Sequence, residues 1–201
     1  MIIPQINLVQ VKTHHKLALK RGKSHLQEML GVEISQDWPH YPEAFEIRGQ
    51  GYELSEIWPA YFFVCPAESA LVGNGGFAAP PNEAGEVEIG YEIAPRFRNK
   101  GYATAATISL IQLAFSARDV TAVVAHTLAH ENASNAVLRK GGMSMVEELP
   151  NAEVEKVWRW SIRRATWSEP CQECPTLQSK SSCQISLPDR DVDDAPRHKR
   201  A

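Results

Sequence analysis

Hydrophobic and polar positions first follow a helical period and then an alternating one. Leucines recur at helical spacing over 17–30, which predicts a helix that ends at Gly31. Two prolines exclude regular helix from 37–42, and a second short helix is expected over 42–49.

The middle of the chain predicts strands. Apolar runs at 61–65 and 71–79 are strand candidates, and three glycines inside the second run indicate the close approach of another backbone. The run 85–95 alternates strictly, so its residues divide between the two faces of one strand. One face carries Glu86, Glu88, Gly90 and Glu92, and the other carries Val87, Ile89, Tyr91 and Ile93.

The second half of the chain predicts alternating helices and strands. The stretch 102–117 is apolar nearly all round, which is typical of a helix buried against a sheet. A buried strand over 120–127 and a helix over 132–140 follow, and then a strand pair at 143–148 and 156–162. This order of elements predicts an α/β (α+β) fold with a mixed central sheet flanked by helices.

Composition divides the chain into one domain and a tail. The 201 residues are 43% hydrophobic, which suits a single domain with a core. Beyond Trp167 no aromatic residue occurs, while prolines and charges accumulate. Such a segment cannot offset its ordering entropy by burial. We therefore expect a domain over 1–167 and a disordered C-terminal tail over 168–201.

Charge and hydrophobic run lengths exclude several classes of protein. With 21 basic and 24 acidic side chains the formal charge is -3, which argues against a nucleic-acid partner held by bulk electrostatics. No apolar run approaches the roughly 20 residues that span a bilayer, and the first residues lack the pattern of a secretion signal. We expect no membrane partner.

The four cysteines predict no metal site. Cys65 stands alone, and Cys171, Cys174 and Cys183 lie near the C-terminus with only His198 to complete a set of zinc ligands. This uneven distribution differs from that of a disulfide-stapled secreted domain. A cytoplasmic protein with reduced thiols is the expectation.

The loop between the alternating strand and the buried helix indicates an anion site. Arg96, Arg98 and Lys100 lie directly before Gly101, where the helix begins. A helix N-terminus exposes unpaired N–H groups and the positive end of the helix dipole, and both attract phosphate. Glycine at 101 and the small Ala103 let a ligand approach the backbone closely. A pyrophosphate is the expected ligand, and a plain basic surface loop is the alternative.

Several stretches around this loop resemble one family. Arg98-x-x-Gly101-x-Ala103 fits the Q/R-x-x-G-x-G/A signature of the GNAT superfamily of acyl-coenzyme A N-acetyltransferases. The wider pattern resembles the ribosomal-protein alanine N-acetyltransferase (RimJ/RimL-like) branch. It covers about 60–145 and is carried by the glycine strand at 75–77 and by 87–95, 98–106, 125–127, 132–134 and 137–143. The resemblance implies the GNAT fold, with a mixed central sheet that splays at the acyl-coenzyme A site.

The resemblance also implies how acetyl-coenzyme A is held. Its pyrophosphate is expected on the loop amides of Arg98, Asn99, Lys100, Gly101, Tyr102 and Ala103. Its pantetheine arm is expected to pair like an added strand with the backbone of Ile93, Ala94 and Pro95. Asn132 is expected to contact the arm near its thiol end, although its spacing to Ser134 departs from the family's by one residue. Capping of the following helix is the other role open to Asn132.

Catalysis in the family is direct attack of an amine on the thioester, and the resemblance implies the same here. The amine must first lose a proton, and Glu88 or Glu92 is the expected base, with Glu88 preferred because it lies deeper in the strand. The tyrosine that many members use as general acid is replaced by Leu138, which leaves Ser134 as the nearest hydroxyl on that helix. His126 and His130 are expected to be structural or surface groups.

The expected function is transfer of an acetyl group to a primary amine, either a protein N-terminus or a small amine. The protein is expected to be a monomer or homodimer. A coenzyme A-binding sensor without turnover is the alternative from another class, which the missing tyrosine keeps open. A generic nucleotide-binding domain is a third possibility, but the chain has no P-loop and no Gly-x-Gly-x-x-Gly fingerprint.

Overall fold

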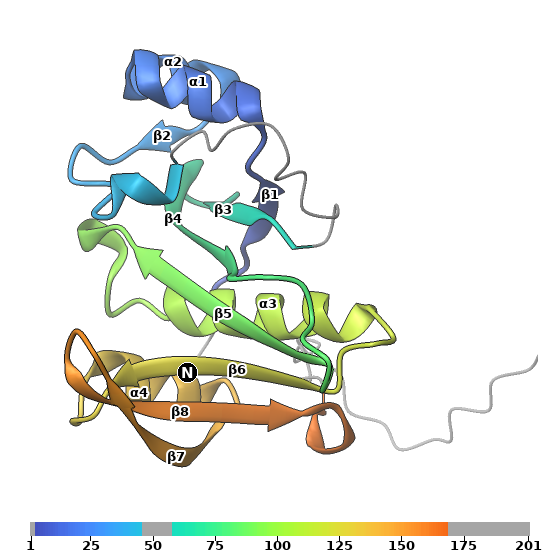
Figure 1. Cartoon of the computed structure of the whole chain (residues 1–201). Helices are drawn as coiled ribbons and strands as arrows, with labels where there is room; N and C mark the ends of the chain where they lie inside the picture. The colour runs from blue at the N-terminus through green and yellow to red at the C-terminus, as the bar shows by residue number, and fades with distance from the viewer. Residues whose placement is uncertain (1–2, 46–57, 169–201) are drawn as a thin grey trace, which may run out of the picture. The chain divides into compact units, whose positions relative to one another are not determined.

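A computed structural model describes residues 3–45 and 58–168 of the chain (Figure 1). Within these ranges an eight-stranded mixed sheet is flanked by four α-helices. The strand order is β1-β3-β4-β5-β6-β8-β7, and β2 pairs with β4. The strands are β1 (Asn7–Gln10), β2 (Glu33–Ile34), β3 (Ala60–Cys65), β4 (Ala70–Phe77), β5 (Glu86–Ile93), β6 (Ala122–Leu128), β7 (Ser144–Asn151) and β8 (Glu155–Arg163). The helices are α1 (Thr13–Arg21), α2 (Lys23–Leu30), α3 (Tyr102–Ser116) and α4 (Ala133–Lys140).

The predicted order of strands and helices is confirmed from β3 onward, with bounds shifted by a few residues. The N-terminal helix is two helices, because Gly22 adopts a φ of 134° that breaks it, and Gly31 ends the second as expected. Only a 3-10 turn over Pro42–Phe45 occupies the start of the second predicted helix, whose remainder lies outside the described residues. Strands β1 and β2 are too short to give an alternating signal and were not predicted.

The predicted C-terminal tail and its three cysteines lie almost wholly outside the described residues. The boundary between domain and tail therefore stays a prediction. Among the described residues, no helix is long and apolar enough to cross a membrane.

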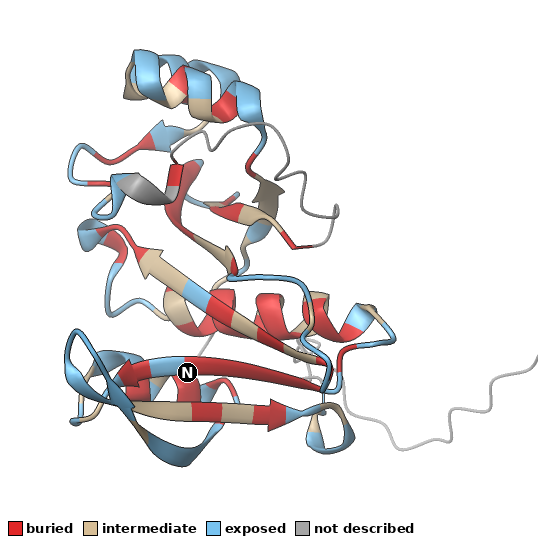
Figure 2. Cartoon of the chain, viewed as in Figure 1, coloured by how far each residue is buried: buried red, intermediate tan, exposed pale blue. Residues whose placement is uncertain are grey.

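Helix α3 is the centre of the helical layer beside the sheet. It packs on β5 and β4, and α4 packs against it. Figure 2 shows α3 buried over most of its length, and Leu110, Ile111 and Ala114 have no exposed surface. They meet the apolar face of β5, on which Val87 and Ile89 are buried. This core fixes the start of α3 directly after the end of β5.

Strands β5 and β6 separate in the middle of the sheet. They are parallel and pair only from Glu86 to Glu88 on β5, opposite Ala122 to Val124 on β6. Beyond this point β5 continues to Ile93 along β4, while β6 continues along β8 (Figure 1). The register therefore confirms the predicted splay, which opens toward the start of α3.

The glycines of β4 allow β5 to approach closely. A Cβ atom on Gly75 would lie 2.3 Å from the carbonyl oxygen of Gly90, whereas a Cβ atom on Gly90 would meet nothing within 4 Å. The two glycines therefore lie in different surroundings. Gly75 is required by backbone packing, and Gly90 leaves open space on the face that carries the glutamates.

Replacing each glycine with alanine tests this difference in surroundings. We expect Gly75→Ala to lower the free energy of unfolding by about 1–3 kcal/mol, because the new methyl group overlaps backbone atoms that cannot move independently. Gly90→Ala should change it by less than about 0.5 kcal/mol, as for an open surface position. Chemical denaturation measures both. Equal destabilisation by the two variants would contradict this view of the β4–β5 contact.

Candidate active site

The loop before α3 has the geometry of an anion cradle. Asn99 and Gly101 have φ angles of 60° and 88°, and Gly101 forms the N-cap of the helix in the left-handed conformation. Left-handed residues next to right-handed ones turn successive N–H groups toward one concave side. No side chain caps α3, and its first turn holds no acidic residue. The amides of the first turn are therefore available to an anion.

The three predicted cations of this loop have different roles. Arg96 is bound to Glu33, with Nη1 donating to Oε1 at 2.5 Å and Nη2 to Oε2 at 3.1 Å. This pairing lowers the pKa of Glu33 below its ordinary value. Arg98 donates from Nε to the carbonyl oxygen of Ile93 at 3.0 Å, which ties the loop to the end of β5. The Arg98 and Lys100 side chains are exposed beside the cradle, whereas Arg96 is occupied by Glu33.

The open edge of β5 presents a specific set of backbone groups. Ala94 donates its amide to Val72 at 3.0 Å, and the Glu88 carbonyl accepts from Ala78 at 2.9 Å, so even-numbered residues of β5 bond to β4. Because backbone groups alternate along a strand, those of Tyr91 and Ile93 face the splay, where β6 no longer pairs. Of the three predicted strand-end residues, only Ile93 offers an amide to the splay. Ala94 uses its amide toward β4, and Pro95 has none.

On the glutamate face of the sheet, Glu88 contacts His126 across the start of the splay. The parallel register places both on the same face, and His126 Nδ1 lies 2.7 Å from Glu88 Oε1. The side chains are 30% exposed for His126 and 43% exposed for Glu88, so the pair is accessible. The sequence predicted that His126 is a structural or surface group, and its contact with Glu88, 38 residues away, could not be identified from the sequence.

Glu92 lies on the same face beside the loop that follows β2. Its Oε2 accepts the amide of His40 at 3.1 Å, while its Oε1 is buried without a hydrogen-bond partner. Burial raises the pKa of the Glu92 carboxyl above its ordinary value, and backbone hydrogen bonds from this loop act in the opposite direction. Gly90 stands between Glu88 and Glu92 with open space above it. Two carboxylates therefore flank an uncovered position of the sheet.

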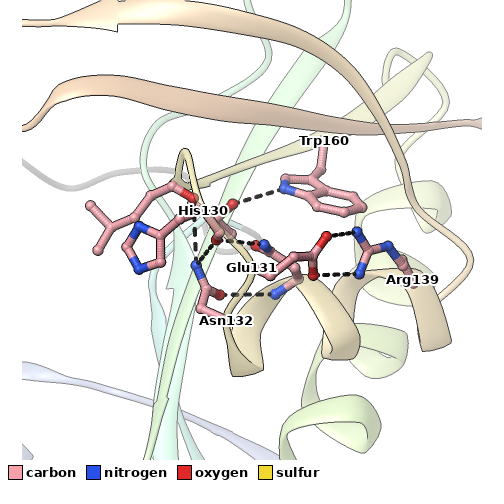
Figure 3. A network of polar contacts seen from close by, with 8 residues as sticks. His130, Glu131, Asn132, Arg139 and Trp160 are labelled. Atoms are coloured by element: carbon pink, nitrogen blue, oxygen red, sulfur yellow. Dashed lines mark hydrogen bonds and ion pairs between the residues drawn. The ribbon is translucent and has the colours of Figure 1, made fainter.

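The N-terminus of α4 is held by a network of polar contacts (Figure 3). Asn132 accepts the amide of Asn135 through Oδ1 at 3.1 Å and donates through Nδ2 to the carbonyl of His130 at 2.9 Å. Glu131 and Arg139 form a bidentate ion pair, in which Nη1 donates to Oε2 at 2.9 Å and Nη2 donates to Oε1 at 2.5 Å. These contacts support the capping role of Asn132, and its predicted coenzyme contact stays a prediction.

Two residues of α4, Leu138 and Ser134, bear on the missing general acid. Leu138 is 1% exposed and belongs to the core, whereas Ser134 is exposed in the first turn of α4. The hydroxyl of Tyr91 is buried beside the hydroxyls of Thr107 and Ser134; burial raises the pKa of Tyr91 to about 12, and hydrogen bonding with these two hydroxyls acts in the opposite direction. The alternating pattern of β5 predicts Tyr91 on the apolar face of the strand, as the structure has it.

Comparisons with known proteins agree with this geometry. The acetyltransferase (GNAT) domain family matches residues 26–144, which is more than half of the chain. The uncharacterized N-acetyltransferase YjdG of Bacillus subtilis (strain 168) is 30% identical over 111 residues. That match covers 51% of this chain and 64% of YjdG, so the chain spans less than two thirds of this relative's length.

Solved structures of acetyltransferases share the fold. A spermidine N-acetyltransferase SpeG chimera from Vibrio cholerae and hSSAT superposes with a TM-score of 0.58 at 14% identity, covering 80% of this chain and 96% of the other. RimL, a ribosomal L7/L12 alpha-N-protein acetyltransferase in complex with coenzyme A, gives a TM-score of 0.56 at 21% identity, covering 81% and 96%. At these identities the likeness establishes the mixed α/β fold alone. Together with the match over 26–144, the fold and the uncapped helix beside a splayed sheet lead to one conclusion: the chain belongs to the GNAT acetyltransferase family.

Proposed function

We propose that the chain transfers an acetyl group from acetyl-coenzyme A to a primary amine by direct attack in a ternary complex. The observation that carries this proposal is the splay between β5 and β6. The uncapped N-terminus of α3 lies at its open end, and the pair of Glu88 and His126 lies at its closed end. The family uses acetyl-coenzyme A, and RimL of the same fold is in complex with coenzyme A.

The residues at the open end of the splay fit the coenzyme. The amides from Arg98 to Ala103 would hold the pyrophosphate, with the Arg98 and Lys100 side chains adding positive charge. The backbone groups of Tyr91 and the amide of Ile93 face the splay and would pair with the amide groups of the pantetheine arm, as in addition of a strand. The Ile93 carbonyl already accepts from Arg98 Nε at 3.0 Å.

Glu88 is the residue best placed to accept the amine proton. It is accessible, it borders the closed end of the splay, and His126 lies 2.7 Å from it. The ammonium group first gives one proton to Glu88, which frees the nitrogen lone pair to bond to the carbonyl carbon. As the amide forms, the nitrogen loses its second proton to solvent, and the electron pair of the carbon–sulfur bond leaves with sulfur. His126 orients the carboxylate, so we assign it a positioning role.

The acceptor face favours a cationic amine. Glu88 and Glu92 flank the open position at Gly90, and the accessible carboxylate of Glu88 can accept a hydrogen bond from an ammonium group. Glu86 on the same face is already bonded to Arg159 at 2.8 Å. A protein N-terminus and a small amine both meet this requirement, since each offers an ammonium group.

The loop assignment predicts a specific loss of coenzyme binding in Gly101→Val. Valine cannot adopt the φ of 88° without strain of about 1–3 kcal/mol, so the cradle should change shape. Gly31→Val is the matched control, because Gly31 has a φ of 66° at the end of α2 with open space around it. Calorimetry should show coenzyme A affinity reduced at least tenfold in Gly101→Val and unchanged in Gly31→Val. Equal affinities in the two variants would contradict the loop assignment.

Turnover with a panel of amines tests the function itself. We expect the purified protein to release coenzyme A from acetyl-coenzyme A in the presence of a primary amine, with the acetylated product found by intact mass. Glu88→Gln should lower the rate by about 10²–10⁴ and remove the acid limb of its pH profile, because the base is lost. Coenzyme binding without turnover of any amine would favour a regulatory module instead.

A further inference from the structure

Helices α1 and α2 expose two large apolar side chains to water. Leu17 is 45% exposed and Met29 is 48% exposed, although both helices bury other residues. His15 and Leu26 are buried, and the ring of His15 lies against that of Phe62 on β3, with 5.6 Å between the centroids. Figure 2 shows that much of the surface of the two helices is exposed. Exposed apolar side chains that lie together mark an interaction surface.

Leu17 and Met29 line one hollow between the two helices, with a volume of about 370 Å³. The residues from α1 recur at the spacing of a single helix face and are His14, Leu17, Ala18 and Arg21. Those from α2 are His25, Glu28 and Met29. Ala18 is small and buried, which leaves room between the helices. The hollow lies at the lower end of the range of ligand pockets, about 300–1,000 Å³, and can take a large apolar side chain.

The surface around the hollow is basic. Residues 1–27 contain five Lys and Arg residues and no Asp or Glu, in a chain whose formal charge is -3. Arg21 lines the hollow, and Lys20 is exposed beside it on α1. Within the part of the chain that the structure describes, no ion pair occupies Arg21 or Lys20. Glu28 is the acidic group of the lining. The positive charge of α1 is therefore available to a partner.

We propose that the hollow between α1 and α2 docks an acidic peptide segment of another protein, which inserts one large apolar side chain between Leu17 and Met29. The basic surface complements acidic residues on both sides of that side chain, and the apolar walls exclude water from it. A nucleic acid also binds basic surfaces, but it has no apolar side chain to fill the hollow, and Glu28 repels its phosphates. A membrane would contact a broad apolar helix face instead of a hollow between two helices.

This docking site is separate from the proposed acetyl-transfer site. Helix α1 follows the edge strand β1, and α2 contacts β2, whereas the splay lies between β5 and β6 (Figure 1). The two sites share no residue, so the inference does not depend on the proposed function.

Fluorescence anisotropy with a labelled synthetic peptide and the full chain tests the docking site. The peptide consists of aspartate and glutamate around a central phenylalanine. It is acetylated at its N-terminus and has no lysine, so it cannot serve as an acetyl acceptor. We expect saturable binding that weakens as the salt concentration rises. A matched peptide with serine in place of phenylalanine should bind at least fivefold more weakly, because nothing fills the hollow.

Variants of the hollow separate its contribution from that of overall charge. Arg21→Glu and Leu17→Ser should each weaken binding of the phenylalanine peptide at least fivefold, since one reverses a charge and the other removes an apolar wall. Arg118→Glu makes the same charge change at an exposed position after α3, and Leu128→Ser replaces a leucine that is 44% exposed on β6. These two controls should change binding less than twofold. Thermal unfolding checks that each variant folds.

Several outcomes would overturn the proposal. The wild type might not bind the phenylalanine peptide at all, or the serine peptide might bind equally well. Equal weakening by Arg21→Glu and Arg118→Glu would reduce the binding to attraction by net charge. If a single-stranded oligonucleotide or vesicles of anionic phospholipid bound more tightly than the peptide and lost affinity in Arg21→Glu, the partner would belong to that class instead. Turnover of acetyl-coenzyme A with an amine is measured separately, so a failure here leaves the proposed function intact.

Discussion

Two parallel strands that pair over three residues and then separate are the constraint on which the rest of the site depends. Backbone amides and carbonyls removed from water need partners, and β6 supplies none to the end of β5. The core between α3 and β5 holds this arrangement, since Ile111 and Val87 are buried where helix and strand meet. A ligand that offers its own amides to this edge would complete the sheet. The same packing places the uncapped N-terminus of α3 at the open end of the splay.

The two faces of the sheet carry different side chains of β5. Alternation along β5 sends Glu88 and Glu92 to one face and Tyr91 to the other, although they are close in the sequence. In the proposed reaction the glutamate face receives the amine and its proton. The period-two pattern of a single strand thus decides which side chains lie on that face and which lie among the helices.

Local signals predicted the parts of this site that are contiguous in the chain. The strand at β5, the helix α3 and the left-handed Gly101 between them each follow from spacing or residue type, so the coenzyme loop could be proposed from the sequence. Contacts between distant segments could not. The bonds of Arg96 to Glu33 and of Glu88 to His126 depend on strand order and register, which no local pattern specifies.

Residue-resolved amide hydrogen exchange with and without saturating acetyl-coenzyme A tests the role of the splay most directly. We expect the amides of Tyr91 and Ile93, together with those of Tyr102, Ala103 and Thr104, to exchange more slowly in the complex, since the ligand would accept hydrogen bonds from them. The pairs between β5 and β4 should be protected in both states. Binding that leaves the amides of β5 and of the α3 N-terminus exchanging as in the free protein would contradict the claim that the coenzyme completes this edge.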